Sequence, residues 1–306
     1  MIYDLIIIGA GPAGLTASIY ASRYKLNHLL IGELPGGLIS EAHSVCNFPG
    51  ANEMSGMDLV EGFLKHAQAL EAEMLLMDKV VKIEKDNNLF KINTSSGKVF
   101  SSKTVLLATG TKHRKLGLDK EAKYLGRGLA YCATCDAMFF KEKVVGVVGG
   151  GNSALTAALY LAKVAKKVYL IVREDSFIGE VAWIEQVKEH PHIEVLFNSI
   201  VTDLAGEERL ESVNILNNNK EETLNLNGLF IEIGTEPDPL LINQLDLKLD
   251  HGYIVVDGEQ KTSLENLWAA GDITTGSNSF RQVITACSEG AIATHSIFTY
   301  LQKNRD

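Results

Sequence analysis

Residues 5–14 read LIIIGAGPAG, an apolar run that passes directly into a glycine-rich turn. A helical pattern follows over residues 15–21, so the local order is strand, turn and helix. Within the turn, Gly9 permits a tight bend, Gly11 lets a pyrophosphate approach the backbone, and Gly14 lets the helix pack closely on the strand. The stretch therefore predicts a Rossmann-like unit whose helix N-terminus binds the pyrophosphate of a dinucleotide.

A second copy of this pattern follows another short apolar run, VVGVV. Gly149, Gly151 and Ala154 take the three key positions, with Asn152 and Ser153 between them. A single turn of this kind is a weak signal, but two turns in the same strand and helix context are a strong one. The repeat predicts an α/β fold with two Rossmann-like doubly wound dinucleotide-binding domains.

The strands outside these turns follow one plan in both halves of the chain. Residues 105–108 and 229–233 form short buried strands that close the two nucleotide-binding sheets. Residues 79–100 and 195–226 alternate apolar and polar side chains, which predicts antiparallel inserts. The last predicted strand, residues 267–270, has no glycine-rich turn of its own, so we expect it to return to the first domain, with the second domain inserted in the first.

Composition excludes several classes of function. The chain has 306 residues and a formal net charge of −9, which argues against a nucleic-acid partner or an anionic membrane partner. No apolar stretch approaches the length of a membrane span, and the N-terminus lacks the basic region and cleavage site of a signal peptide. We therefore expect a cytoplasmic protein.

The cysteines indicate redox chemistry. Cys132 and Cys135 lie three positions apart and are followed by Asp136, whereas four cysteines in all are too few for a secreted disulfide framework. A zinc site would need two further ligands at suitable spacing, and no histidine pair supplies them, so we expect no metal. Cys46 and Cys287 have no such neighbour, and we expect both to be small buried residues. The pair beside two nucleotide turns indicates a flavin-linked disulfide reductase.

On these motifs, taken in order, the chain resembles the low-molecular-weight thioredoxin reductases, an FAD-dependent pyridine nucleotide-disulfide oxidoreductase family, from end to end. The resemblance implies a discontinuous FAD-binding domain, residues 1–113 and 239–306. It implies a nicotinamide domain with the cysteine pair over residues 114–238, a homodimer, and a thioredoxin or thioredoxin-like protein as disulfide partner.

The resemblance also assigns roles to single residues. Cys135 faces the flavin, Cys132 attacks the partner's disulfide, and Asp136 transfers the proton; the alternative for Asp136 is a helix cap. Leu38 stands where the family usually has glutamine. Asp272 accepts from a ribityl hydroxyl, or caps the helix that begins near Ser279. The implied FAD contacts are Gly9, Gly11, Pro12, Ala13, Gly14, Gly32, Glu33, Gly36, Gly37, Leu38, Asn47, Thr109, Gly110, Gly271, Asp272, Arg281, Gln282 and Val283.

The nicotinamide cofactor is selected where the strand over residues 167–172 ends, at Arg173 and Glu174. NADPH-dependent members of the family carry a His-Arg-Arg cluster and a further arginine there, whereas this chain has Val172, Arg173, Glu174 and then Ile178. A carboxylate about 4 Å from a phosphate charge costs about 1 kcal/mol in water and about 4 kcal/mol at an effective dielectric constant of about 20. The same carboxylate accepts from the free ribose hydroxyl of NADH, so the sequence predicts NADH over NADPH.

Four other interpretations remain open. Some relatives take electrons from ferredoxin or a deazaflavin, although the intact turn from Gly149 to Ala154 favours a nicotinamide. A second FAD in that domain is a further possibility. A flavin redox sensor without turnover has less need of a complete Cys-x-x-Cys-Asp motif, and a ferredoxin:NADP reductase of similar fold has no use for the cysteine pair.

Overall fold

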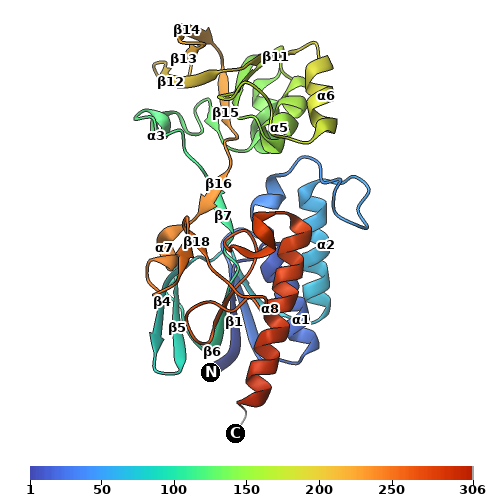
Figure 1. Ribbon diagram of the computed structural model, residues 1–306, viewed down its shortest axis with the longest axis vertical. Helices are drawn as coiled ribbons and strands as arrows, with labels where there is room; N and C mark the ends of the chain where they lie inside the picture. Colours follow the sequence, from blue (N-terminus) through green and yellow to red (C-terminus); the bar gives the residue numbers. More distant parts are fainter. Residues whose placement is uncertain (305–306) are drawn as a thin grey trace. The chain divides into compact units, whose positions relative to one another are not determined.

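The computed structural model describes residues 1–304, apart from the side chain of Ser279. The chain forms two compact units (Figure 1). Unit 1 contains Met1–Lys112 and the described residues from Glu236 onward, and unit 2 is His113–Thr235. The two segments where the chain passes between the units, β7 (Thr111–His113) and β16 (Thr235–Pro237), pair as a two-stranded sheet.

Unit 1 is built on a seven-stranded sheet in the order β3-β2-β1-β6-β5-β4, with β19 paired to the end of β6. Strands β1, β2, β3, β6 and β19 run parallel, whereas β4 and β5 form an antiparallel hairpin beside the first half of β6. The strands are β1 (Ile2–Ile8), β2 (His28–Gly32), β3 (Glu73–Leu76), β4 (Val80–Asp86), β5 (Leu89–Thr94), β6 (Val99–Leu107) and β19 (Leu267–Ala269). A smaller hairpin in this unit joins β17 (Leu249–Asp250) to β18 (Tyr253–Ile254).

The side chains of β1 divide the core of unit 1 between the two faces of the sheet. Leu5 and Ile7 pack with residues of the helices on one face, and Ile6 and Ile8 pack with residues of β5 and α7 on the other. A strand buried on both faces needs a continuous apolar run, which explains why β1 lacks alternation. The helices of this unit are α1 (Pro12–Arg23), α2 (Gly56–Ala69), α7 (Pro239–Ile242) and α8 (Val283–Lys303), with 3₁₀ turns η1 (Gly37–Glu41) and η3 (Gly276–Ser279).

Unit 2 has a five-stranded parallel sheet in the order β11-β10-β9-β15-β8. Val145 and Val147 pack with α5 on one face, and the antiparallel sheet β12-β13-β14 covers the other (Figure 1). The strands are β8 (Leu129–Ala130), β9 (Val144–Val148), β10 (Lys167–Ile171), β11 (Ile193–Leu196), β12 (Ser199–Ala205), β13 (Ser212–Asn217), β14 (Lys220–Asn225) and β15 (Gly228–Ile231). The helices are α3 (Glu121–Tyr124), α4 (Ala133–Asp136), α5 (Asn152–Ala162) and α6 (Val181–Glu189), with the 3₁₀ turn η2 (Ala137–Phe140).

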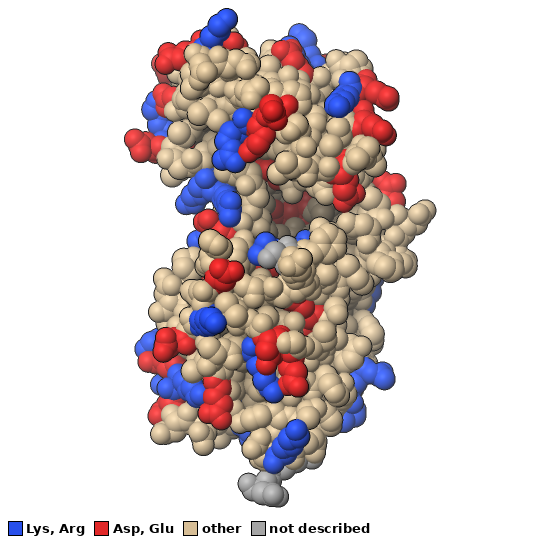
Figure 2. All heavy atoms as spheres, viewed as in Figure 1, with Lys and Arg blue, Asp and Glu red and all other residues tan. Residues whose placement is uncertain are grey.

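These elements confirm the predicted strand plan. Both predicted inserts are antiparallel, and the strand predicted over residues 267–270 is β19, which pairs with β6 in unit 1. No helix in the described part of the chain has the combination of length and apolarity that crossing a bilayer demands. Figure 2 shows acidic and basic side chains interspersed on the visible face of each unit.

Candidate redox and dinucleotide sites

The first glycine-rich turn leaves no room for side chains. Gly9 has a φ of +116°, and a Cβ there would lie 2.1 Å from the carbonyl oxygen of Ala108. A Cβ on Gly14 would lie 1.9 Å from the carbonyl oxygen of Gly9. Helix α1 begins at Pro12 with Gly11 as an extended N-cap, and no side chain caps it. The uncapped N–H groups and the helix dipole favour an anion at this turn, as the sequence predicts.

The next predicted loop packs onto the same turn. The Gly36 N–H donates to the Ala10 carbonyl at 2.7 Å, and a Cβ on Gly37 would lie 3.4 Å from the Cα of Gly11. A Cβ on Gly32 would lie 2.4 Å from the Cβ of Ala10. The structure thus brings three of the predicted glycines against the backbone of the first turn.

Three other predicted FAD contacts, Thr109, Glu33 and Leu38, make contacts of other kinds. The backbone nitrogen of Thr109, which precedes Gly110, lies 2.9 Å from the position of a Cβ on Gly9. Glu33 pairs with Lys79 at 3.3 Å. Leu38 lies half-buried in η1.

A buried carboxylate holds the segment after β19, and sequence reasoning missed it. Glu289 in α8 is 4% exposed and accepts from the Gly271 N–H at 2.8 Å. It also accepts from the hydroxyls of Thr274 at 3.0 Å and Ser277 at 2.6 Å. The available signal was an acidic residue on the helix face that also carries buried Ala286. Because a buried carboxylate needs hydrogen-bond donors, a glutamate at such a position indicates that a neighbouring segment donates hydrogen bonds to it.

Asp272 and Arg281, both predicted site residues, lie within this segment. The Arg281 Nε donates to the Asp272 carbonyl at 3.2 Å, and its guanidinium carbon lies 3.8 Å from the centre of the Tyr253 ring. Burial raises the pKa of Asp272 to about 6, the charge of Glu289 adds to the rise, and the charge of Arg281 opposes it.

Asp272 is not the cap of the helix that follows. Helix α8 begins at Val283, and Gln282 and Thr285 form its capping box. Gln282 also accepts from the side-chain amide of Asn47 at 3.1 Å. The alternative prediction of a cap at Asp272 is therefore wrong, because its carboxylate caps neither η3 nor α8.

The pKa of Asp272 predicts a pH-dependent stability. Its pKa in the folded chain lies above the ordinary value of 3.8, so the native state binds more protons than the unfolded chain between pH 3.8 and about 6. Stability should therefore fall as the pH rises through this window. We expect Asp272→Asn to raise the unfolding free energy of ligand-free protein at pH 7 by about 2 kcal/mol, and to leave it unchanged below the window. Urea unfolding at pH 4 to 8 measures this.

A control separates this effect from a general loss of negative charge. Asp250→Asn removes a carboxylate from an exposed position of β17 and should leave the pH dependence of the wild type intact. Parallel stability curves for wild type and Asp272→Asn would contradict the assignment.

The cysteine pair forms a disulfide. Cys132 is the N-cap of α4, its Sγ is bonded to that of Cys135, and the Cα atoms are 5.4 Å apart. The Cys135 N–H donates to the Cys132 Sγ at 3.1 Å. Cys135 is exposed and Cys132 is half-buried. Asp136 is the last residue of α4 and caps no helix with its side chain, so the alternative prediction of a cap there is also wrong.

Of the two remaining cysteines, which were both predicted to be buried, one is exposed and the other is partly buried. Cys46 is exposed, so the expectation that it is buried was wrong. It lies in a loop rather than in a strand or helix, and the sequence carried no periodic pattern there to reveal its exposure. Cys287 is partly buried in α8, and burial raises the pKa of its thiol.

The second glycine-rich turn repeats the geometry of the first. Gly149 has a φ of +139°, and a Cβ there would lie 2.2 Å from the carbonyl oxygen of Glu232 and 3.0 Å from the Cβ of Ala154. Helix α5 begins with Gly151 as an extended N-cap and has no side-chain cap. The structure therefore offers a second anion-favouring helix terminus in unit 2.

The side chain of Asn152, the first residue of α5, closes onto the loop before α6. Its Oδ1 accepts from the Glu180 N–H at 2.7 Å, and its Nδ2 donates to the Glu180 carboxylate at 3.0 Å. Ser153, next in the helix, accepts from Thr156 through its carbonyl. Both polar atoms of the Asn152 side chain are thus hydrogen-bonded to Glu180.

The strand end at which the sequence predicts the ribose to bind carries an ion pair. The Arg173 Nε and Nη2 donate to one carboxylate oxygen of Glu174 at 2.9 and 2.6 Å, and this contact lowers the pKa of Glu174. Ile178, the position of the missing arginine, is 77% exposed, and its N–H donates to the Gly150 carbonyl at 3.0 Å. An open hollow of about 420 Å³ adjoins Arg173 and is lined also by Asn198, Ile200, Leu216, Asn218 and Asn219.

Comparison with known proteins assigns a family to this arrangement. The model of the family described as pyridine nucleotide-disulphide oxidoreductase matches residues 3–290. The chain belongs to this family. A thioredoxin reductase of Treponema pallidum is 40% identical over 98% of this chain and 97% of its own length, and one of Mycoplasma genitalium is 38% identical over 96% and 93%.

Solved structures agree with the family assignment. The pyridine nucleotide-disulphide oxidoreductase fold of this chain matches thioredoxin reductase from Lactococcus lactis in its FR conformation with a TM-score of 0.94, at 30% identity over 98% of this chain and 99% of the other. Thioredoxin reductase from T. acidophilum matches with a TM-score of 0.91, at 34% identity over 97% and 98%. These findings confirm the predicted resemblance, the fold of two dinucleotide-binding domains, and an oxidoreductase of this family.

Proposed function

We propose that the protein is a thioredoxin-disulfide reductase that carries electrons from NADH through FAD to the disulfide of Cys132 and Cys135, and from there to a thioredoxin-like protein. One observation supports this most strongly. The Cys132–Cys135 disulfide lies in a chain with two glycine-rich turns whose helix N-termini are uncapped. The names of the relatives agree with it. By resemblance we also propose a cytoplasmic homodimer.

Unit 1 is the proposed FAD unit. Its turn fits a pyrophosphate, because α1 begins without a side-chain cap and a Cβ on Gly11 would have only the Gly36 carbonyl oxygen, at 3.8 Å, as a neighbour. Asp272, held in place through Glu289 and Arg281, supplies a carboxylate for a ribityl hydroxyl. When bound, FAD accepts a hydride from a reduced nicotinamide and delivers electrons to a disulfide.

The cysteines perform the exchange with the partner. In the reduced protein, the Cys132 thiolate attacks one sulfur of the partner's disulfide, and the other partner sulfur leaves as a thiolate. Cys135 then attacks the Cys132 sulfur, which releases the second partner thiolate and restores the Cys132–Cys135 disulfide. The N–H of Cys135 donates to Cys132 and favours its thiolate form. Asp136, next in sequence, is the proposed proton donor to the leaving thiolates.

Unit 2 is the proposed nicotinamide unit, and Glu174 is its selecting residue. Arg173 alone remains of the family's phosphate-binding arginines, and its guanidinium is already paired with Glu174. Both side chains are more than a third exposed, so the pair itself contributes less than about 1 kcal/mol. A 2′-phosphate would nevertheless have to displace Glu174 and remain close to its charge. This arrangement supports NADH over NADPH.

Anaerobic mixing of the oxidised, FAD-loaded protein with each nicotinamide tests the proposal by stopped-flow absorbance of the flavin. We expect fast loss of flavin absorbance with NADH and loss slower by at least about a hundredfold with NADPH at subsaturating concentrations. Fast reduction by NADPH would overturn the preference. Failure of both would instead favour ferredoxin or a deazaflavin as the electron donor.

An exposed apolar pair beside the disulfide supports a protein substrate. Met138 and Phe139 follow the redox motif in η2 and are 67% and 72% exposed. We expect the double variant Met138→Ser, Phe139→Ser to raise the KM for a thioredoxin about tenfold, because exposed apolar side chains at the centre of a contact carry much of its affinity.

The KM for the small disulfide 5,5′-dithiobis(2-nitrobenzoate) should stay unchanged in the same double variant, because this compound needs no protein surface. Met77→Ser is the control, since Met77 is an exposed methionine outside the redox motif. Equal effects on both substrates would place the pair in the exchange chemistry rather than in docking.

A further inference from the structure

We infer that Glu121 and Tyr131 form a positioning pair that fixes the backbone ahead of Cys132 and thereby sets the reactivity of its thiol. The Tyr131 hydroxyl donates to the Glu121 Oε1, and Tyr131 is bonded through its own carbonyl carbon to Cys132. The inference deepens the proposed function and rests on it. Neither residue touches the reacting sulfurs in the contacts that the structure gives, so their role is positioning.

Glu121 is a buried group with demanding hydrogen-bond requirements. Only 6% of it is exposed, and it accepts from the Leu116 N–H at 3.1 Å and the Gly117 N–H at 2.9 Å as well as from Tyr131. All three donors are neutral. Because a buried carboxylate is costly unless its oxygens are satisfied, these contacts hold the glutamate, the loop before α3 and the tyrosine in one arrangement.

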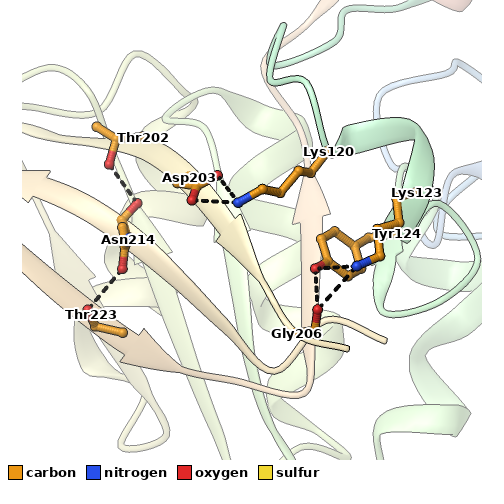
Figure 3. A network of polar contacts seen from close by, with 8 residues as sticks. All are labelled: Lys120, Lys123, Tyr124, Thr202, Asp203, Gly206, Asn214 and Thr223. Atoms are coloured by element: carbon orange, nitrogen blue, oxygen red, sulfur yellow. Dashed lines mark hydrogen bonds and ion pairs between the residues drawn. The ribbon is translucent and has the colours of Figure 1, made fainter. Parts of the chain in front are cut away.

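Contacts of Lys120 and Tyr124 connect the helix that carries Glu121 to β12 and the turn after it (Figure 3). Lys120 reaches both carboxylate oxygens of Asp203 on β12, at 2.9 and 2.8 Å. The Tyr124 hydroxyl donates to the Gly206 carbonyl at 2.7 Å. Helix α3 has only four residues and would not be stable alone. These contacts with β12 and the turn after it therefore fix the position of the helix backbone that carries Glu121.

Tyr131 connects the fixed Glu121 to the redox motif, because its side chain is held at two points and its backbone continues into Cys132. Its ring stacks on His113, with ring centres 5.5 Å apart and planes 24° apart, while its hydroxyl is held by Glu121. Burial and the neighbouring carboxylate both raise the pKa of Tyr131, so the hydroxyl remains a neutral donor. With both the ring and the hydroxyl held, the peptide that leads into Cys132 has little freedom.

The orientation of Cys132 matters because its sulfur accepts the Cys135 N–H. That hydrogen bond requires the extended backbone at Cys132, with φ −123° and ψ 102°. A hydrogen bond to the thiolate lowers the thiol pKa and raises the reactive fraction at neutral pH. Releasing Tyr131 should therefore weaken the N–H contact and raise the pKa of the Cys132 thiol.

Alkylation of Cys132 tests the inference without any turnover. In full-length, FAD-loaded protein carrying Cys135→Ser, which keeps the donating N–H, iodoacetamide labelling at a series of pH values gives the apparent pKa of Cys132. Mass spectrometry of the Cys132 peptide keeps the exposed Cys46 out of the signal. Adding Tyr131→Phe should raise the apparent pKa by about one unit, which lowers labelling at neutral pH about tenfold.

Two further variants separate positioning from loosened structure. Glu121→Gln weakens the same contact and should shift the profile in the same direction, and it is the second route if Tyr131→Phe folds poorly. Tyr169→Phe removes a tyrosine hydroxyl of the same unit that accepts from Lys167 and has no part in holding α3, and it should leave the profile unchanged. An unchanged profile in Tyr131→Phe, or an equal shift in Tyr169→Phe, would overturn the inference. Because labelling needs no nicotinamide, failure of NADH-dependent turnover would be a separate result.

Discussion

Replacing Cys132 with serine is expected to lower the rate of thioredoxin reduction by at least about a thousandfold. A serine hydroxyl cannot form a bond to the partner's sulfur that a second thiol later breaks, so the exchange has no first step. Cys135 remains in the variant but has no partner with which to form the intramolecular disulfide that completes the exchange. The loss should appear in turnover and not in binding, because no other side chain changes. NADH oxidation with thioredoxin as acceptor measures it.

A second acceptor shows whether the rest of the enzyme is intact. Ferricyanide takes electrons without a disulfide, so its reduction by NADH should proceed at the wild-type rate in Cys132→Ser. Cys46→Ser is the matched control, because Cys46 is an exposed thiol in unit 1 that belongs to no disulfide. It should leave both rates unchanged. Retained thioredoxin reduction in Cys132→Ser, or its loss in Cys46→Ser, would show that electrons leave through another thiol.

The parts of this molecule that the sequence predicts are those set by local chemistry. Gly9 and Gly149 are glycines because a side chain there would collide with backbone at the end of the neighbouring strand, and the strand, turn and helix order around each is contiguous in sequence. The apolar run of β1 indicates burial on both sheet faces, and the structure divides its side chains between two core clusters. The disulfide of Cys132 and Cys135 likewise follows from a spacing of three residues.

The parts that the sequence did not predict depend on pairs brought together by folding. Glu289 binds Gly271, 18 residues away, and Glu121 binds Tyr131, 10 residues away, and no motif connects either pair. Their one signal is a glutamate among residues that the fold buries, and sequence alone does not distinguish such a glutamate from an exposed one. The cap predictions for Asp136 and Asp272 were wrong for a related reason. Asp136 precedes η2 but its side chain makes no capping hydrogen bond there, and Gln282 already caps α8, because capping depends on backbone geometry.

Converting the ribose site is expected to reverse the nicotinamide preference. We expect Glu174→Arg combined with Ile178→Arg to raise the ratio of NADPH to NADH efficiency by about a thousandfold. Removing the carboxylate relieves about 1 to 4 kcal/mol of repulsion, and each charge-assisted hydrogen bond to a phosphate adds about 1.5 kcal/mol or more. The substitution also releases Arg173 from its ion pair, so a third guanidinium becomes available to the phosphate. The measurement is kcat/KM for each nicotinamide with ferricyanide as acceptor.

The single variants and a charge reversal elsewhere in unit 2 distinguish a direct phosphate contact from a general change of charge. Glu185→Arg makes the same charge reversal at an exposed position of α6 and should change the ratio less than about threefold, because salt and solvent screen the charges of exposed side chains that do not contact the phosphate. Glu174→Arg alone should gain more than Ile178→Arg alone, since only the former also removes a repulsive charge. If Ile178→Arg alone gave the whole effect, the selecting group would be the missing arginine and not the carboxylate. The proposed preference for NADH would then reflect weak phosphate binding and not its rejection by Glu174.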